Sequence, residues 1–244
     1  GKSHDPFVLS ADPSKPDFEV PDLLPPPEIG TARLNRRQKM RDIVDSTLRN
    51  FEQSADAQLL DGNFQAAYLL MTSPQAKDAF DLSKEDPRTV AKYGGGLGSS
   101  MLMARRLCEA GCGYVTIHAS YAGVWDMHAD GNNLNMIDGM EAVGRSFDHA
   151  VAAFIRDCEA RGLSDKILLV CCGEMGRTPK INKRGGRDHW ARLAPLILYG
   201  GGLGGGKVIG QSDKQGGEPN SKPYSPGHLI STILRTMIDP GQLR

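Results

Sequence analysis

The stretch KILLVCCGEMGRTPKINKRGGRDHW, residues 166–190, joins the most apolar run of the chain to a strongly charged loop. Residues 166–172 are almost continuously apolar, which is typical of a strand covered on both faces of a sheet. The charged side chains of the loop that follows include Glu174, Arg177, Arg187, Asp188 and His189. A solvated loop is the simplest interpretation, so the rest of the chain decides whether these side chains form a site.

Further strands and helices alternate along the same part of the chain. Residues 113–120 and 194–200 are short and rich in apolar and β-branched residues, which predicts two more strands. Residues 99–110, 135–161 and 228–237 are expected to form helices, the middle one strongly amphipathic. Because alternating strands and helices favour parallel pairing, the sequence predicts an α/β fold with a largely parallel sheet covered by helices on both faces.

The chain divides into three stretches of different composition. Residues 1–30 are rich in proline and lack regular periodicity, which predicts an extended arm. Residues 31–93 are expected to be a helical segment, because residues 33–50 and 55–70 carry apolar side chains at near-helical spacing. Residues 94–244 are expected to be the sheet portion, the C-terminal part of one larger domain.

Composition excludes several classes of function. The chain has 244 residues, of which 29 are basic and 29 acidic, so its formal net charge is zero. This balance argues against a nucleic-acid partner or an anionic membrane surface. The apolar runs are far shorter than the roughly 20 residues that cross a bilayer, so no membrane span is expected. The five cysteines lack zinc-motif spacing, so neither a disulfide framework nor a structural zinc site is expected.

The glycine-rich segment after the last predicted strand resembles a nucleotide-binding loop only superficially. Gly200, Gly202 and Gly205 formally fit the pattern GxGxxG. No helix follows whose N-terminus would meet a pyrophosphate, so the segment is expected to be a turn and not a dinucleotide site.

The loops that follow the first two predicted strands both carry acids and histidines. Active sites of parallel sheets collect at the carboxyl ends of the strands. The first loop carries Asp126 and His128, which are two residues apart and would face the same side of an extended backbone. The second carries Asp188 and His189, which are adjacent and would point to opposite sides of a strand. Both could bind one ion only in an irregular loop; otherwise one of them would support the other without binding the ion. Carboxylates together with imidazoles suit zinc, manganese or iron, and a metal site is therefore predicted.

Each of these residues also has a purely structural interpretation. Asp126 and His128 would then be a turn acid and a surface histidine. Glu174 and Arg177 would form a local salt bridge, and residues 188–190 would cap a short helical turn. These alternatives stay open until the geometry of the loops is known.

Several motifs, in the same order and spacing, resemble one bacterial family. They are LMARRLCEAGCGYVTI at residues 102–117, WDMH at 125–128, GEMGRTPKIN at 173–182, GRDHW at 186–190 and GGGLGGGKVIGQSD at 200–213. They are similar to the family called domain of unknown function 1501, which is placed beside the sulfatases in the alkaline phosphatase superfamily and is abundant in planctomycetes. The resemblance covers essentially the whole chain, although members usually have Phe where this chain has Met175.

The resemblance implies a metal-dependent hydrolase of phosphate or sulfate esters. It implies a divalent ion, either zinc, manganese or calcium, held by acids and histidines. The residues that match such ligands are Asp126, His128, Glu174, Asp188 and His189. Arg177 and Arg187 are then expected to hold the substrate oxyanion, because a planar guanidinium matches phosphate or sulfate bidentately. The expected substrate is a small anionic ester or a sulfated or phosphorylated glycan.

The resemblance also implies that this chain is the C-terminal portion of a family member. The first strand of the superfamily, which bears another metal-binding Asp and the nucleophile, is expected to precede it. Exposed core surface, and association through that surface, are therefore expected. Relatives often carry an export signal, which implies an extracytoplasmic location. The alternative function is a non-catalytic structural or carbohydrate-associated surface protein that retains the fold.

Overall fold

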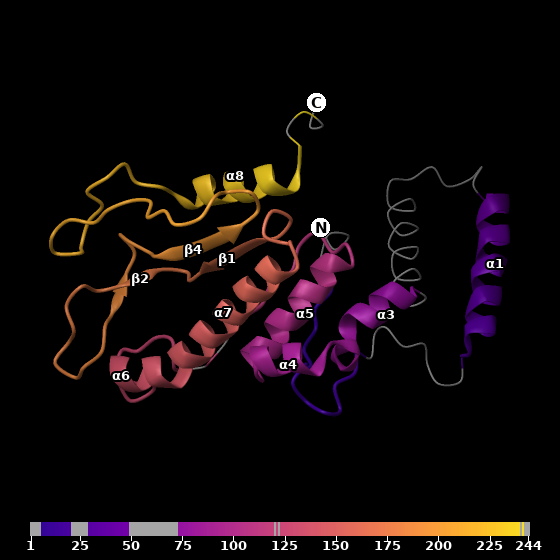
Figure 1. The fold of residues 1–244 in the computed structure, drawn as a ribbon, viewed down its shortest axis with the longest axis horizontal. Coiled ribbons are helices and arrows are strands. Elements are labelled where there is room, and N and C mark those ends of the chain that lie inside the picture. The colour runs from indigo at the N-terminus through magenta and orange to yellow at the C-terminus, as the bar shows by residue number, and fades with distance from the viewer. Residues whose placement is uncertain are drawn as a thin grey trace.

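The computed structural model describes residues 6–20, 29–48, 73–119, 121, 123–239 and 241, and Figure 1 shows their arrangement. The helices before the loops of interest are α1 (Thr31–Leu48), α3 (Pro74–Phe80), η3 (Leu82–Lys84), α4 (Pro87–Tyr93) and α5 (Leu97–Glu109). The later elements are α6 (Met136–Gly139), η4 (Met140–Gly144), α7 (Arg145–Ala160), β1 (Leu168–Cys172), β2 (Gly176–Arg177), β3 (His189–Trp190), β4 (Leu196–Gly200) and α8 (Pro226–Met237). None of the described helices is long and apolar enough to cross a membrane.

The main core lies between α5 and α7, which run side by side in Figure 1. Its buried members are Tyr93, Leu97, Met101, Leu102, Ala150, Val151, Ala153, Phe154 and Cys158. Leu169 and Cys171 of β1 and Tyr199 of β4 pack against this cluster, so one face of the two strands covers it. Burial of these apolar side chains, at about 25 cal/mol per Å², is the main term that holds the helices on the sheet.

The helix predicted at residues 135–161 is confirmed, with one irregularity. It consists of α6, η4 and α7 in succession, and η4 is a single π-helical stretch. Asn135 begins it, because its side-chain oxygen accepts hydrogen bonds from the backbone N–H groups of Ile137 and Asp138. Gly162, in a left-handed conformation with φ of 65°, follows its last turn.

The predicted largely parallel sheet, covered by helices on both faces, is wrong. The described residues form two separate two-stranded antiparallel sheets, β1 with β4 and β2 with β3. In the first, Leu168 lies opposite Gly200 and Cys172 lies opposite Leu196. Leu196 and Ile197 at the start of β4 leave opposite faces of the sheet and are both exposed, so neither face is fully covered there by the described elements.

Two features of the chain explain why the parallel sheet does not form. Residues 173–195 contain the short β2–β3 hairpin and no helix, whereas a parallel pair needs a crossover connection, usually helical. The predicted strand at residues 113–120 is also wrong for its described residues, because residues 113–119 join no ladder. Ile117 and Ala119 pack against the main core, so this apolar run reflects burial and not strand pairing.

The described part of the proline-rich arm, residues 6–20, has no helix or strand and packs on the helices. Val20 is buried in a second cluster with Phe80 and Met103. The rings of Phe7 and Phe80 meet edge to face, with centroids 6.1 Å apart. The predicted helix at residues 33–50 corresponds to α1, and the helical pattern at residues 55–70 lies outside the described residues.

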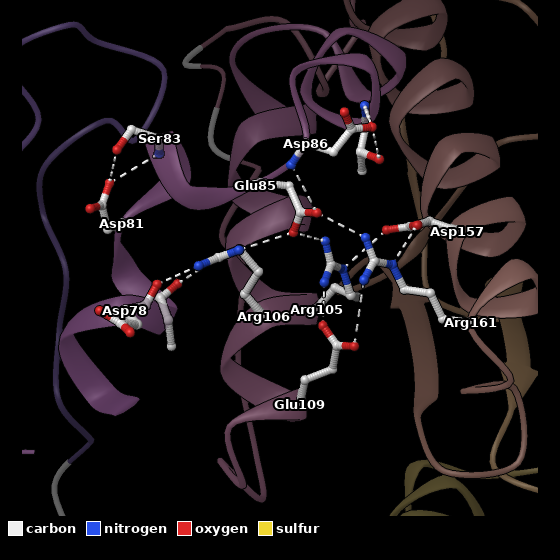
Figure 2. A network of polar contacts seen from close by, with 12 residues as sticks. Asp78, Asp81, Ser83, Glu85, Asp86, Arg105, Arg106, Glu109, Asp157 and Arg161 are labelled. Atoms are coloured by element: carbon white, nitrogen blue, oxygen red, sulfur yellow. Dashed lines mark hydrogen bonds and ion pairs between the residues drawn. The ribbon is translucent and has the colours of Figure 1, made fainter. Parts of the chain in front are cut away.

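A buried ionic network centred on Arg105 joins α4, α5 and α7 (Figure 2). The Arg105 side chain is only 1% exposed and contacts Glu85, Glu109 and Asp157. Arg161, which directly follows α7, reaches Glu85 at 2.8 Å and Asp157 at 2.8 Å. Glu85 lies between η3 and α4, so its carboxylate connects three helical elements from different parts of the chain.

Candidate metal centre

Three side chains that can bind a metal ion converge between two loops. Asp126 and His128 come from the loop before α6, and His189 begins β3. One nitrogen or oxygen atom of each lies within 4.8 Å of those of the other two. The Nε2 atoms of His128 and His189 are 3.1 Å apart, and His189 Nε2 lies 3.2 Å from Asp126 Oδ1. The third separation, from His128 Nε2 to Asp126 Oδ1, is 3.8 Å.

The β2–β3 hairpin brings His189 and Arg177 to this group. Arg177 lies directly opposite His189 in the antiparallel pair, so their side chains leave the same face. Gly176 is required beside them, because a Cβ atom there would stand 1.7 Å from the carbonyl oxygen of Leu193. The close passage of the chain at Gly176 therefore fixes where the hairpin starts.

Apolar anchors hold the loop that carries Asp126 and His128. The indole N–H of Trp125 donates to the carbonyl oxygen of Ala119 at 2.8 Å, and its ring meets Phe147 of α7 edge to face. Met127 is buried against α6. Asp126 and His128 both contact residues of the hairpin. They do so through an irregular backbone and not an extended one, because Met127 between them has φ of 45°.

The imidazole of His128 lies between Asp188 and His189. Its Nδ1 atom is 3.2 Å from Asp188 Oδ1, while its Nε2 atom faces His189. If Nδ1–H donates to the carboxylate, neutral His128 keeps the lone pair on Nε2. Asp188 and His189 are adjacent in the chain and would diverge, yet both contact the ring of His128, one at each of its two nitrogen atoms. Residues 188–190 do not cap a helical turn, since His189 and Trp190 form β3.

Arg177 is an ion-pair partner of the group and not of Glu174. Its Nη2 atom lies 2.5 Å from Asp126 Oδ1, and its Nη1 atom lies 3.3 Å from His128 Nε2. The hydrogen bond from Arg177, followed by that from His189, holds the pKa of Asp126 below its usual range. Asp126 therefore stays a carboxylate at neutral pH.

The structure separates Glu174 from the other predicted ligands. Its side chain is exposed, belongs to no group of neighbouring ligand atoms, and makes no ion pair with the described residues. Arg187 contacts the loop that carries Asp126 and His128. Its backbone N–H donates to the carbonyl oxygen of Met127 at 2.9 Å. Its side-chain Nε is buried and has no hydrogen-bond partner among the described residues.

Asn182, at the tip of the hairpin loop, also contacts this region and was missed in the sequence. Its side-chain Nδ2 donates to the carbonyl oxygen of His128 at 2.9 Å. The available signal was an Asn four residues before Gly186, because Asn side chains often close turns onto their own backbone. Nothing in the sequence indicated that the same amide would reach the other loop.

The chain belongs to a known protein family. The family model described as "Protein of unknown function (DUF1501)" matches residues 1–243, essentially the whole chain. No curated protein and no solved structure matches this chain.

Proposed function

We propose that this member of the DUF1501 family is a metal-dependent hydrolase of phosphate or sulfate esters, related to the sulfatases and the alkaline phosphatase superfamily. In this proposal Asp126, His128 and His189 hold a divalent cation. The single observation that carries the proposal is the close approach of their three ligand atoms. The resemblance of the motifs to the sulfatase-like proteins supplies the reaction class.

The spacing of the three atoms fits a small cation. In a tetrahedral zinc site, with ligand atoms about 2.0–2.1 Å from the ion, neighbouring ligand atoms are about 3.3 Å apart. The separations of 3.1 and 3.2 Å that involve His189 are close to this value. The separation of 3.8 Å between His128 and Asp126 is slightly long, and a small side-chain rotation would close it.

The donor set narrows the identity of the cation. Two imidazoles and one carboxylate suit zinc or manganese better than calcium, which prefers six to eight oxygen ligands. A bound ion of this kind would polarise an ester oxygen and activate a water molecule near neutral pH. Three protein ligands are also the number found in catalytic zinc sites, where a further position takes water or substrate.

Asp188 supports the ligand role of His128 without being a ligand. A carboxylate on the Nδ1 atom of a metal-binding histidine fixes the tautomer and raises the basicity of Nε2. Asp188 stands in that relation to His128, at 3.2 Å. Glu174 is left out of the proposed ligand set because the structure places it apart.

The positive charge around the group favours an anionic substrate. Arg177 lies beside Asp126, and the buried Nε atom of Arg187 has no described partner that a substrate oxyanion would have to displace. Lys180, Lys183 and Arg184 on the same loop are exposed and form no ion pairs with described residues. Such clustered cations raise the local concentration of anionic esters, including sulfated or phosphorylated glycans. An extracytoplasmic location belongs to the same proposal and is supported by the family resemblance alone.

Metal content and ester hydrolysis test the proposal together. Purified protein is expected to contain zinc or manganese, and His189→Ala to lose most of it, because a first ligand bond is deleted. His149→Ala is the matched control, since His149 is an exposed histidine of α7 outside the group. Hydrolysis of 4-nitrophenyl phosphate or 4-nitrophenyl sulfate should follow metal content. Unchanged metal content in His189→Ala would refute the ligand assignment, and full metal content without hydrolysis of either ester would favour a non-catalytic protein.

A further inference from the structure

The side chain of Asn182 makes contacts with two loops at once. Its Oδ1 atom accepts hydrogen bonds from the backbone N–H groups of Arg184 and Gly186, each at 3.0 Å. Its Nδ2 atom donates to the carbonyl oxygen of His128 at 2.9 Å. Two donors face one end of the amide and an acceptor faces the other, so the partners fix its orientation.

Hydrogen bonds also close residues 182–186, the turn of the hairpin loop, which we call the Asn182 cap. The backbone N–H of Asn182 donates to the carbonyl oxygen of Gly186 at 2.7 Å, and that of Gly185 donates back to Asn182 at 3.0 Å. Gly186 then lies directly against His128, because a Cβ atom at Gly186 would stand 2.3 Å from the His128 carbonyl carbon. The cap touches the backbone of His128 and leaves its imidazole free to face the group.

The backbone on each side of His128 needs such support. Met127 and Ala129 have φ of 45° and 55°, a left-handed conformation that costs a residue with a Cβ atom about 1–2 kcal/mol. Conformations of this kind persist only where surrounding contacts over-determine them. Here Arg187 N–H holds the Met127 carbonyl, and the Ala129 N–H donates to the carbonyl oxygen of Leu134 at 3.0 Å. The amide of Asn182 holds the carbonyl of the residue between them.

We propose that Asn182 is a positioning residue for the metal centre: its side-chain amide fixes the backbone of His128 so that Nε2 faces Asp126 and His189. Asn182 touches neither the cation nor the substrate. Asp188 orients the ring of His128 and Asn182 orients its backbone, so two separate contacts define one ligand. The inference rests on the proposed function, because it assigns a role within that metal centre.

Two substitutions separate the two ends of the amide. Asn182→Ala removes both, and is expected to lower Zn²⁺ affinity about 10- to 100-fold, the usual effect of losing a residue that supports a metal ligand. Asn182→Asp keeps the acceptor for Arg184 and Gly186 but places a carboxylate oxygen against the His128 carbonyl. It should lower Zn²⁺ affinity as much as Asn182→Ala does, while lowering the melting temperature of the metal-free protein less. Asn133→Ala is the matched control, since it removes an Asn hydrogen bond, to Asp130, from the neighbouring loop.

The experiment measures Zn²⁺ affinity of the full chain by competition with a chromogenic chelator, the visible spectrum of the Co²⁺ form, and the melting temperature without metal. The expected result is weaker Zn²⁺ binding and an altered Co²⁺ spectrum in both Asn182 variants, with wild-type values for Asn133→Ala. Wild-type affinity in Asn182→Ala, with affinity lost in His128→Ala, would overturn the inference and leave the proposed function standing. Wild-type Zn²⁺ affinity in Asn182→Asp would show that Asn182 acts only within its own turn, and would also overturn the inference. Wild-type affinity in His128→Ala would instead overturn the metal centre itself.

Discussion

Arg177 shows how a single residue can both support and oppose a metal centre. Its guanidinium holds Asp126 in the ionised state that a cation needs, because the hydrogen bond lowers the pKa of the carboxyl. The same guanidinium occupies Asp126 Oδ1 and places a positive charge beside the position of a divalent ion. The second effect should dominate for binding, since Asp126 is ionised at neutral pH with or without its partner.

Arg177→Ala is therefore expected to bind Zn²⁺ more tightly at pH 7, by about fivefold, because about 1 kcal/mol of charge repulsion is removed. Arg177→Lys keeps the charge and should stay near the wild-type affinity. In the metal-free protein the pKa of Asp126 should rise in Arg177→Ala, which carboxyl NMR titration would detect. The contribution of this carboxylate to stability is present at neutral pH and is lost as the pH falls through the lowered pKa. Weaker Zn²⁺ binding in Arg177→Ala would show that Arg177 mainly orients Asp126.

The residue types of the candidate site were predictable, but their individual roles were not. Asp126 and His128 contact the same hairpin, but not through the extended backbone that their spacing suggested, because Met127 between them has φ of 45°. The separation of Asp188 from His189 depends on the ring of His128 standing between them, 60 residues away in the chain. Contacts of that kind leave no local trace in the sequence.

At the scale of elements, the β2–β3 hairpin brings the candidate site residues together, whereas the sequence predicted that the edge of a parallel sheet would do so. Helices and strands were recognisable because periodicity is a local property, as for α6 to α7 and for β1 and β4. Strand direction is not local. The direction of β4 relative to β1 depends on whether the connection between them contains a helix. That connection contains β2 and β3 instead, and these strands have too few residues to be recognised in the sequence. The two loops still converge, but the backbone N–H of Arg187 donates to the Met127 carbonyl, and the side-chain amide of Asn182 donates to the His128 carbonyl.

Gly176→Ala tests whether the hairpin positions His189. A Cβ atom at Gly176 would meet the Leu193 carbonyl at 1.7 Å, and backbone cannot yield as a flexible side chain does. The variant is expected to lose about 1–3 kcal/mol of stability and to bind Zn²⁺ more weakly, because β2 must shift away from β3. Gly205→Ala is the control, since nothing lies within 4 Å of its Cβ position. Urea unfolding and chelator competition measure the two effects, and unchanged Zn²⁺ affinity would show that the hairpin does not set the ligand geometry.

At the scale of the whole molecule, the apolar core and the Arg105 network do different work. The core cluster between α5, α7 and the β1–β4 sheet supplies most of the driving force. The network selects one arrangement of α4, α5 and α7, because a buried guanidinium is tolerated only where its partners surround it (Figure 2). On α8, Ile230, Leu234 and Met237 are exposed at helical spacing, so association through apolar surface stays a prediction.

Glu85 makes the stability of the fold depend on pH in the acid range. Burial alone would raise the pKa of this carboxyl, but hydrogen bonds from Arg105 and Arg106 outweigh burial and lower the pKa from 4.5 to about 2. A carboxyl with a lowered pKa stabilises the fold fully above its unfolded value. The wild type should therefore lose on the order of 3 kcal/mol from this group as the pH falls from 4.5 to about 2.

Glu85→Gln removes that dependence and leaves Arg105 without its main buried counter-charge. Its free energy of unfolding at pH 7 should fall by roughly 3 kcal/mol, and its difference from the wild type should shrink as the pH approaches 2. Glu141→Gln is the matched control, because Glu141 pairs with Arg145 at 2.9 Å on an exposed helix surface, where such a pair contributes about 0.5 kcal/mol or less. Urea unfolding of the three proteins at several pH values between 2 and 7 gives both quantities. If Glu85→Gln were as stable as the wild type at pH 7, the network would be a passive consequence of core packing, because an unpaired Arg105 would then cost nothing in an interior where its side chain is only 1% exposed.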